Sequence, residues 1–393
     1  MKSRNIPVLA ISLALSQSGV AAVVLLGGIV GSAIAPSPAL ATLPLSLMVL
    51  GVALFVIPAS LLMRRIGRRN GFMLAAGLAG AGGLVSAYAL TQRDFALFCV
   101  GTMMIGANGA FVQQYRFAAA ESVEHEHAGR AVSFVLLGGI LAGYLGPEVA
   151  RRTQNLFGGE FYSGAFISIA ILYGVAILLL SLLRNVAPPE AINVAVGRPL
   201  TEIARQPNYL IAVMAGLVSY GVMTFIMTAT PVHLNNLGNY SLDQTALIIQ
   251  SHIVAMYLPS LITGFLVERL GLVRIMIAGS LLLLTTTIIA IVSREFAHYW
   301  VALVLLGLGW NLLFVGGTVL LTYTYRPEER FKTQASNDFI VFAVQASASL
   351  SAGSVLYFSS WDRLNLISMG IVLVAFVLVL VRRRELPGLA AAT

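Results

Sequence analysis

Long apolar runs, separated by short polar segments, follow one another along the whole chain. Each run is about as long as the roughly 20 residues that an α-helix needs to cross a bilayer. In hydrocarbon every backbone N–H and C=O group must be bonded within its own segment, so the runs predict helices. Twelve runs meet this description, at residues 8–30, 40–63, 72–91, 95–120, 131–149, 162–183, 209–231, 244–267, 272–292, 299–323, 333–358 and 364–381.

Charged residues make up only 10% of the chain, against about 25% in soluble domains, and 58% of the residues are hydrophobic. This composition excludes an ordinary soluble enzyme. The single cysteine, Cys99, excludes an internal disulfide and a cysteine-based zinc site. The first run is longer than the apolar core of a signal peptide, so we expect it to remain as a helix.

The basic residues predict the orientation in the membrane. Lys and Arg concentrate in the cytoplasmic segments of membrane proteins. With the N-terminus placed in the cytoplasm, 19 of the 24 Lys and Arg residues fall on inner segments and 5 on outer ones. The sequence therefore predicts an all-α membrane protein with 12 transmembrane helices and cytoplasmic N- and C-termini, a multi-pass protein of the inner (plasma) membrane.

A weak internal duplication runs through the chain at an offset of 202–204 residues. The proline-rich stretch 185–208 indicates a cytoplasmic linker, so we predict two pseudo-symmetric six-helix bundles, residues 1–184 and 209–393. Parallel repeats of this kind hold their solute site near the bilayer midplane, between the halves. The matched pairs include Arg65 and Arg269, Gly67 and Gly271, Gly106 and Gly309, and Asn108 and Asn311.

Two of the repeated loops carry a family resemblance. Gly264-Phe265-Leu266-Val267-Glu268-Arg269-Leu270-Gly271 resembles the loop signature of the major facilitator superfamily between helices 8 and 9. The matching first-half loop has Ser60 and Arg64 where that family has glycine and aspartate. The resemblance implies a twelve-helix transporter whose loops act as conformational switches, here through Arg65, Gly67, Arg68, Gly264, Glu268, Arg269 and Gly271.

A second resemblance lies in the fifth run. The segment from Gly139 to Pro147 is similar to the glycine–proline motif on helix 5 of drug/proton antiporters. Glu148 and Val149 follow the proline where that motif has glycines. The resemblance implies proton-coupled export, with a departure at the end of the motif.

Few ionisable residues lie inside the apolar runs, where they are costly and usually functional. Asp338, about two turns inside the eleventh run, is the predicted proton carrier; a helix cap or an ion pair at the inner end is the alternative. Glu148, near the outer end of the fifth run, is either a second coupling group or the ion-pair partner of Arg151 or Arg152.

Polar and aromatic residues on the first, fourth, seventh and tenth helices predict the solute site, because these helices line the cavity in the resembled family. Their mixture implies an amphipathic solute with a planar body. Arg116 either faces that cavity or reaches the inner surface; the spacing of four predicts that it shares a helix face with Asn108. The candidate solute-binding residues are Gln17, Asn108, Gln113, Arg116, Tyr220, Met223, His252, Trp310 and Asn311.

The chain contains no ATP-binding, HExxH or nucleophile-elbow motif, so we expect neither an enzyme nor a cofactor, metal or nucleic-acid partner. The leading hypothesis is a monomeric secondary transporter in the lipid bilayer that exports a small amphipathic organic solute by coupling to protons. An importer of an aromatic vitamin, for example riboflavin, is the alternative, motivated by scarce carboxylates and by Trp310, Asn311 and Asn108. A sensor or scaffold that does not transport is a third hypothesis, motivated by Arg64.

Overall fold

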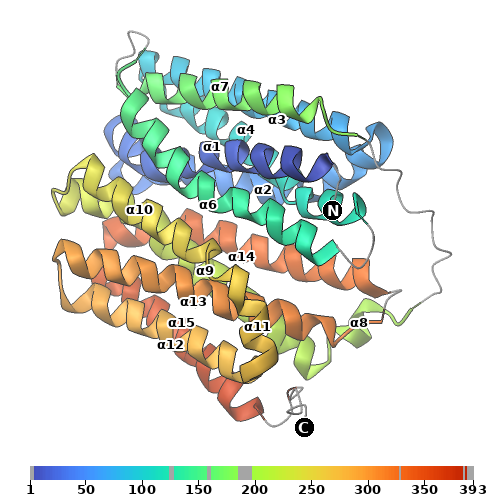
Figure 1. The fold of residues 1–393 in the computed structure, drawn as a ribbon. Coiled ribbons are helices and arrows are strands. Elements are labelled where there is room, and N and C mark those ends of the chain that lie inside the picture. Colours follow the sequence, from blue (N-terminus) through green and yellow to red (C-terminus); the bar gives the residue numbers. More distant parts are fainter. Residues whose placement is uncertain are drawn as a thin grey trace. The chain divides into compact units, whose positions relative to one another are not determined.

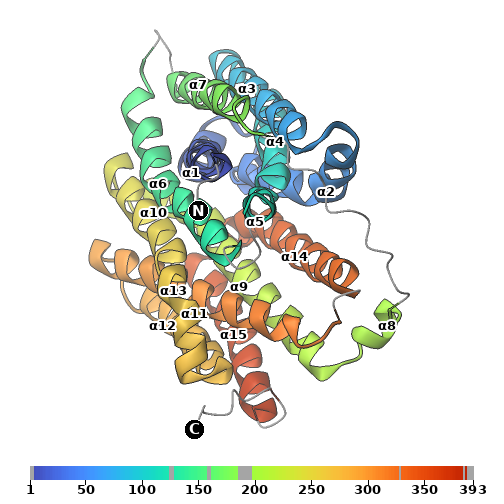
Figure 2. The same cartoon turned by 45° about the vertical axis from the view of Figure 1, so that its right-hand side comes forward.

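The computed structural model describes residues 4–123, 128–156, 161–184, 197–326, 329–383 and 386, and the regular elements within these ranges are all helical (Figure 1, Figure 2). The predicted all-α fold is therefore confirmed. Two short turns, η1 (Pro38–Leu40) and a π-helical turn at His233–Leu237, accompany the α-helices. The α-helices are α1 (Asn5–Ile34), α2 (Leu43–Ile66), α3 (Arg68–Gln92), α4 (Phe95–Val112), α5 (Tyr115–Glu121), α6 (Ala128–Thr153), α7 (Ser163–Leu180), α8 (Leu200–Ile203), α9 (Pro207–Val232), α10 (Leu242–Tyr257), α11 (Ser260–Leu270), α12 (Leu272–Val292), α13 (Phe296–Thr322), α14 (Arg330–Phe358) and α15 (Trp361–Arg382).

Twelve helical segments of the described chain are long and apolar enough to cross a membrane, as the sequence predicts. Two of them are interrupted, which the sequence analysis did not foresee. The segment Phe95–Ala119 consists of α4 and most of α5, and the segment Leu242–Val267 consists of α10 and most of α11.

The interruption between α10 and α11 lies at Pro259, whose nitrogen carries no hydrogen and whose ring crowds the preceding turn. A proline alone does not interrupt a helix in this protein, because Pro58 and Pro147 lie inside the continuous helices α2 and α6. Neighbouring side chains that bond to the freed backbone groups make the difference, as described for the functional site.

Two compact units make up the fold, and each is described by itself. Unit 1 comprises Met1–Ala187, Met227–Val254 and Ser349–Ser359; unit 2 comprises Pro188–Ile226, Ala255–Ala348 and Ser360–Thr393. Unit 1 thus contains α1–α7, most of α10, and the C-terminal ends of α9 and α14. This division follows packing, so the predicted bundles 1–184 and 209–393 stay a prediction from sequence. Residues 185–196 of the predicted linker lie outside the described part of the chain.

Two glycines repeat the same backbone geometry in both halves of the sequence. Gly67 joins α2 to α3 with a φ of 81°, and Gly271 joins α11 to α12 with a φ of 89°. A positive φ strains residues with a Cβ atom but not glycine. The loop repeat seen in the sequence is therefore present in the backbone as well.

The offset of 202–204 residues does not pair the glycines that make matching contacts on α4 and α13. A Cβ atom on Gly101 would lie 2.7 Å from the Gly82 carbonyl oxygen of α3, and one on Gly309 would lie 3.0 Å from the Gly279 carbonyl oxygen of α12. Gly106, which the offset pairs with Gly309, packs against the backbone of α2 instead. The two asparagines that follow these glycines therefore have different surroundings.

A buried carboxylate in unit 2 ties the segment before α8 to the connection between α13 and α14. The Glu329 side chain is fully buried and accepts hydrogen bonds from Arg198 Nε at 2.9 Å and Nη2 at 2.7 Å, and from the Arg326 backbone at 3.0 Å. Arg198 Nη2 also donates to the Thr324 carbonyl oxygen at 3.1 Å. The Arg198 guanidinium holds the pKa of Glu329 well below its usual range.

This lowered pKa gives a pH-dependent stability. A carboxyl group with a lower pKa in the folded than in the unfolded state stabilises the fold above its unfolded pKa of about 4.3, and this contribution fades as the pH falls further. We expect Glu329→Gln to lower the thermal unfolding temperature of the purified protein at pH 7, with a shrinking effect below about pH 4.

Glu202→Gln is the matched control, because Glu202 is exposed and lies 3.8 Å from the same Arg198 guanidinium. Exposed pairs contribute little, so the control should unfold close to the wild-type temperature at every pH. An equal loss of stability in Glu329→Gln at pH 7 and pH 3 would contradict the assignment.

Candidate functional site

Five aromatic rings from four helices meet inside unit 2. Trp310 and Phe314 of α13 are stacked, with centroids 5.1 Å apart and planes 16° apart. Tyr220 of α9 presents its ring edge-on to both of them, each at 5.1 Å, and to Phe342 of α14 at 5.8 Å. Tyr257, at the end of α10, lies 6.4 Å from the Trp310 ring. We call these five residues the aromatic cluster.

The Trp310 indole gives this cluster a hydrogen-bond donor that has no acceptor among the described residues. Trp310 is 4% exposed, and its Nε1–H has no hydrogen-bond partner among the described residues. A buried N–H group without a partner is costly, so such a group marks a place where a ligand or water accepts a bond. Met223, one turn after Tyr220 on α9, is also buried.

Asn311, the neighbour of Trp310, forms hydrogen bonds on both sides of the break between α10 and α11. Its Nδ2 donates to the Met256 carbonyl oxygen at 2.8 Å and to Ser260 Oγ at 2.6 Å. Its Oδ1 accepts from Thr263 Oγ1 at 2.7 Å. These bonds satisfy a carbonyl group that the break at Pro259 releases from the helix ladder. We call this arrangement the Asn311 clamp; it fixes where α10 ends, and hence where Tyr257 lies.

Asn108 of unit 1, by contrast, is buried without such bonds. It is 1% exposed, and neither amide atom meets hydrogen-bond geometry with a described residue. The Tyr173 hydroxyl lies within reach of Asn108 and donates to the Ser16 carbonyl oxygen at 3.1 Å; the Tyr115 hydroxyl lies near the Ser16 side chain. Ser12, one turn earlier on α1, is also fully buried. The interior of unit 1 therefore holds several buried polar side-chain atoms that have no hydrogen-bond partner among the described residues.

The prediction that Asn108 and Arg116 share one helix face assumes a regular α-helix between them. In the structure the helix has a tighter turn between these residues. The Gln114 N–H donates to the Phe111 carbonyl oxygen, three residues back, at 2.9 Å instead of following the spacing of four. Arg68 donates to the Gln114 carbonyl oxygen at 3.1 Å, which also accepts from the backbone N–H groups of Phe117 and Ala118. The half-buried Arg116 lies over the Phe117 ring at 4.8 Å.

Four further candidates are not among the five residues of the aromatic cluster. Gln17 of α1 and Gln113 at the end of α4 are half-buried, and His252 of α10, which belongs to unit 1, is 1% exposed. Asp338 of α14 is half-buried and accepts a hydrogen bond from Asn337 Nδ2 at 3.1 Å. Within the described residues no group of three or more His, Cys, Asp or Glu could hold a metal ion.

Glu148 takes part in an ion-pair network at one end of unit 1. Arg151 Nη2 lies 2.9 Å from Glu148 Oε1, and Arg151 Nη1 lies 3.0 Å from Asp243 Oδ1 at the start of α10. Arg152 also pairs with Glu148. The ion-pair alternative from the sequence thus has its geometry in the structure, and Asp243 is a partner that sequence reasoning missed.

Buried hydroxyl groups join α2, α9 and α14 within unit 1. Ser46 Oγ donates to the Ser349 carbonyl oxygen at 2.8 Å, and Thr228 Oγ1 lies 3.0 Å from Ser349 Oγ. A Cβ atom on Gly353 would lie 2.1 Å from Thr42 Oγ1, so only glycine allows α14 to approach α2 this closely. We call Ser46, Thr228, Ser349, Thr42 and Gly353 the interlock.

The predicted switch residues lie at the α2–α3 and α11–α12 connections. Arg65 is exposed, Arg68 bonds to the α4–α5 interruption as described, and Arg269 lies over the Phe265 ring at 5.9 Å. Gly264 has open space around it within α11. The Glu268 side chain lies outside the described part of the structure.

Sequence reasoning found Tyr220 and Trp310 but not the partners that complete their cluster. Phe342 comes from a helix without a solute-binding candidate, and Tyr257 comes from the helix on which the sequence analysis named only His252. The spacing of four between Trp310 and Phe314 was the one available signal, since residues four apart share a helix face.

Comparisons with known proteins agree with this architecture. The family model of the Major Facilitator Superfamily matches residues 8–249 and 212–392. The riboflavin transporter RfnT of Brucella anthropi is 42% identical over 394 residues, covering 99% of this chain and 98% of that protein. The uncharacterised transporter YdeG of Bacillus subtilis is 30% identical, covering 93% and 88%.

Solved structures show the same fold. A bacterial homologue of the human lysosomal transporter Spinster superposes with a TM-score of 0.74 at 12% identity, covering 96% of both chains. The human organic anion transporter MFSD10 superposes with a TM-score of 0.71 at 14% identity, covering 96% of this chain and all of that one.

The two asparagines give a matched test of the Asn311 clamp. Asn311→Leu removes the side-chain donor to the carbonyl oxygen of the buried Met256, at a cost of about 1–3 kcal/mol, and we expect a clear fall in the thermal unfolding temperature of the purified protein. Asn108→Leu removes an amide that makes no hydrogen bond of good geometry with a described residue, so its unfolding temperature should change much less. Equal losses in the two variants would show that Asn311 has no special bracing role.

Proposed function

Because this chain belongs to the major facilitator superfamily, we propose that it is a secondary transporter that imports riboflavin or a closely similar flavin. The family and the fold are those of transporters and not of enzymes. A relative 42% identical along nearly the whole chain carries riboflavin in its name, which supports the importer alternative raised from the sequence.

The aromatic cluster is the observation in the structure that supports a flavin. Riboflavin carries a planar three-ring system with carbonyl oxygens along one edge. Aromatic side chains bind such rings through stacked and edge contacts. The Trp310 Nε1–H, which has no partner among the described residues, can donate to a ring carbonyl. The remaining predicted solute residues, Gln17, Asn108, Gln113, Arg116 and His252, stay candidates from the sequence.

Asp338 is the proposed coupling group. A carboxyl group in a membrane helix takes up a proton when its surroundings become apolar and releases it when a polar or basic partner approaches. Import coupled to protons and export in exchange for protons remain competing directions. Net accumulation of riboflavin by expressing cells supports import, whereas net depletion supports export.

Substitution of Trp310 tests the flavin site. Trp310→Ala removes a ring that would stack on the flavin and an N–H group that would donate to it, each worth about 0.5–1.5 kcal/mol, so riboflavin uptake should lose affinity by roughly 5- to 100-fold. Initial rates of labelled riboflavin uptake into cells lacking other flavin transporters measure the effect as a change in KM.

Trp300→Ala is the matched control, because Trp300 lies on the same helix outside the aromatic cluster and is 39% exposed. It should transport with a KM close to that of the wild type. Trp310→Phe should retain most of the affinity through stacking and lose the contribution of the N–H group. Wild-type KM in Trp310→Ala would contradict the proposed site.

The interlock joins α2, which belongs to the first predicted bundle, to α9 and α14, which belong to the second. Alternating access between these bundles therefore requires the interlock to separate during each cycle. Since Ser46 Oγ and Ser349 Oγ lie 3.1 Å apart, cysteines at these two positions can form a disulfide. In a Cys99→Ala background, we expect oxidation of Ser46→Cys/Ser349→Cys to abolish riboflavin uptake and reduction to restore it.

A cross-link between α12 and α13 provides the control. Thr286 Oγ1 of α12 donates to the Ala302 carbonyl oxygen of α13 at 3.1 Å, and both helices belong to the same predicted bundle, residues 209–393. Oxidised Thr286→Cys/Ala302→Cys should keep its uptake. If the cross-linked interlock variant still transports at the wild-type rate, the interlock does not open during transport.

A further inference from the structure

A groove on the surface of unit 1 lies outside all of the features above. It runs between α3 and α7, which lie side by side along one edge of unit 1 in Figure 1 and Figure 2. Its volume is about 560 Å³. The lining residues are Asn70, Met73, Leu74, Gly77, Leu78 and Ile177.

Missing side chains create this groove. A Cβ atom on Gly77 would meet only the tip of Ile177, at 3.9 Å, and one on Gly174 of α7 would meet nothing within 4 Å. Deeper along the same pair of helices, a Cβ atom on Gly83 would lie 3.0 Å from the Phe166 carbonyl oxygen. Gly83 therefore allows close helix packing, whereas Gly77 leaves space that the protein does not fill.

The groove has the length and polarity of a site for a hydrocarbon chain. Its α3 residues recur every three or four positions, so they form one helix face about 12 Å long at 1.5 Å per residue. The lining is apolar apart from Asn70 at one end, and Leu74 is 58% exposed. A helix face of this kind in a membrane protein is in contact with lipid chains.

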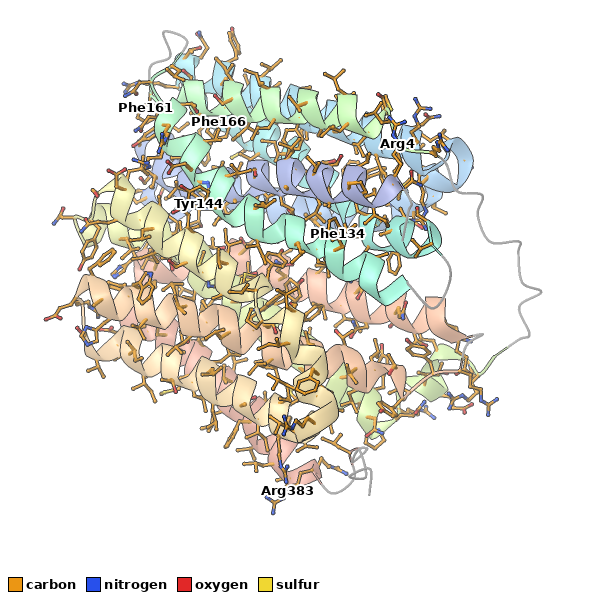
Figure 3. The ribbon with its side chains drawn as sticks, viewed as in Figure 1. Arg4, Phe134, Tyr144, Phe161, Phe166 and Arg383 are labelled. Carbon is orange, nitrogen blue, oxygen red and sulfur yellow. The ribbon has the colours of Figure 1, made fainter. Side chains whose placement is uncertain are left out.

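Basic residues gather at the Asn70 end of the groove. Asn5 Nδ2 donates to the Arg184 carbonyl oxygen at 3.0 Å, and the Arg184 N–H donates to Asn5 Oδ1 at 3.0 Å, which joins the start of α1 to the segment after α7. The side chains of Arg4, Arg65 and Arg184 are exposed there, and Figure 3 shows Arg4 beside the adjoining ends of α3 and α7. None of the three has an ion-pair partner among the described residues.

We propose that this groove binds one anionic phospholipid, with its phosphate at Arg4 and Arg184 and an acyl chain along Gly77. Arginines at the edge of a membrane helix pair attract anionic headgroups, and the apolar groove accepts the chain that follows. The proposal is independent of the transported solute. It also fits the positive-inside distribution, which predicts that this end lies in the cytoplasmic leaflet.

Native mass spectrometry of the detergent-purified chain tests the proposal with phosphatidylglycerol as the added lipid. We expect the wild type to retain one lipid molecule. Gly77→Leu places a side chain in the groove, where a Cβ atom would meet only Ile177, at 3.9 Å, and Arg4→Gln/Arg184→Gln removes the charge. Each should weaken retention by roughly tenfold. Gly370→Leu on α15, where a Cβ atom would meet nothing within 4 Å, is the matched control and should retain the lipid.

The probes separate the groove from general attraction to charge. Phosphatidylcholine should be retained roughly tenfold less well than phosphatidylglycerol, and glycerol phosphate should fail to displace the bound lipid. Undiminished retention in Gly77→Leu would overturn the role of the groove. Equal retention of the neutral lipid, or displacement by glycerol phosphate, would overturn the combined recognition of headgroup and chain.

Discussion

The structure depends on one constraint: a polar group buried in hydrocarbon needs a partner within the protein, because no water is present to supply one. Helices can be interrupted only where such a partner exists. At Pro259 the Asn311 clamp bonds to the freed carbonyl group of Met256. After α4, the Gln114 carbonyl oxygen accepts from the backbone N–H groups of Phe117 and Ala118 as well as from Arg68. These bonds decide where α10 ends and therefore where Tyr257 meets Trp310 in the aromatic cluster.

A transporter must hold its solute in a defined place and still change shape in every cycle. The aromatic cluster meets the first need, because rings packed edge-to-face and stacked have few alternative arrangements. The interlock meets the second. It consists of neutral hydroxyl bonds, each contributing only about 0.5–1.5 kcal/mol, and of small residues that approach without side-chain interdigitation. With one partly exposed ion pair at Asp243, such a contact can separate at modest cost.

Residue types in the sequence predicted part of the candidate site. The apolar runs identified the right helices for Tyr220 and Trp310, since ring-bearing residues are rare on otherwise aliphatic segments. They did not reveal that Asn108 and Asn311, matched by the repeat, differ in their bonding. That difference arises because α4 packs Gly106 against α2, whereas α13 packs Gly309 against α12. Which face of a helix packs against which neighbour depends on residues distant in sequence. The periodicity of apolar residues along one helix carries no information about them.

The sequence by itself determined the twelve membrane-spanning segments and the two glycine-linked loops. Length, hydropathy and the left-handed backbone of Gly67 and Gly271 are local properties that the chain carries wherever it packs. Only the tertiary structure decided which helices break, which asparagine braces a break, and which rings meet Trp310. Those outcomes depend on partners brought together across the fold, since a buried donor is satisfied only by the acceptor that lies beside it.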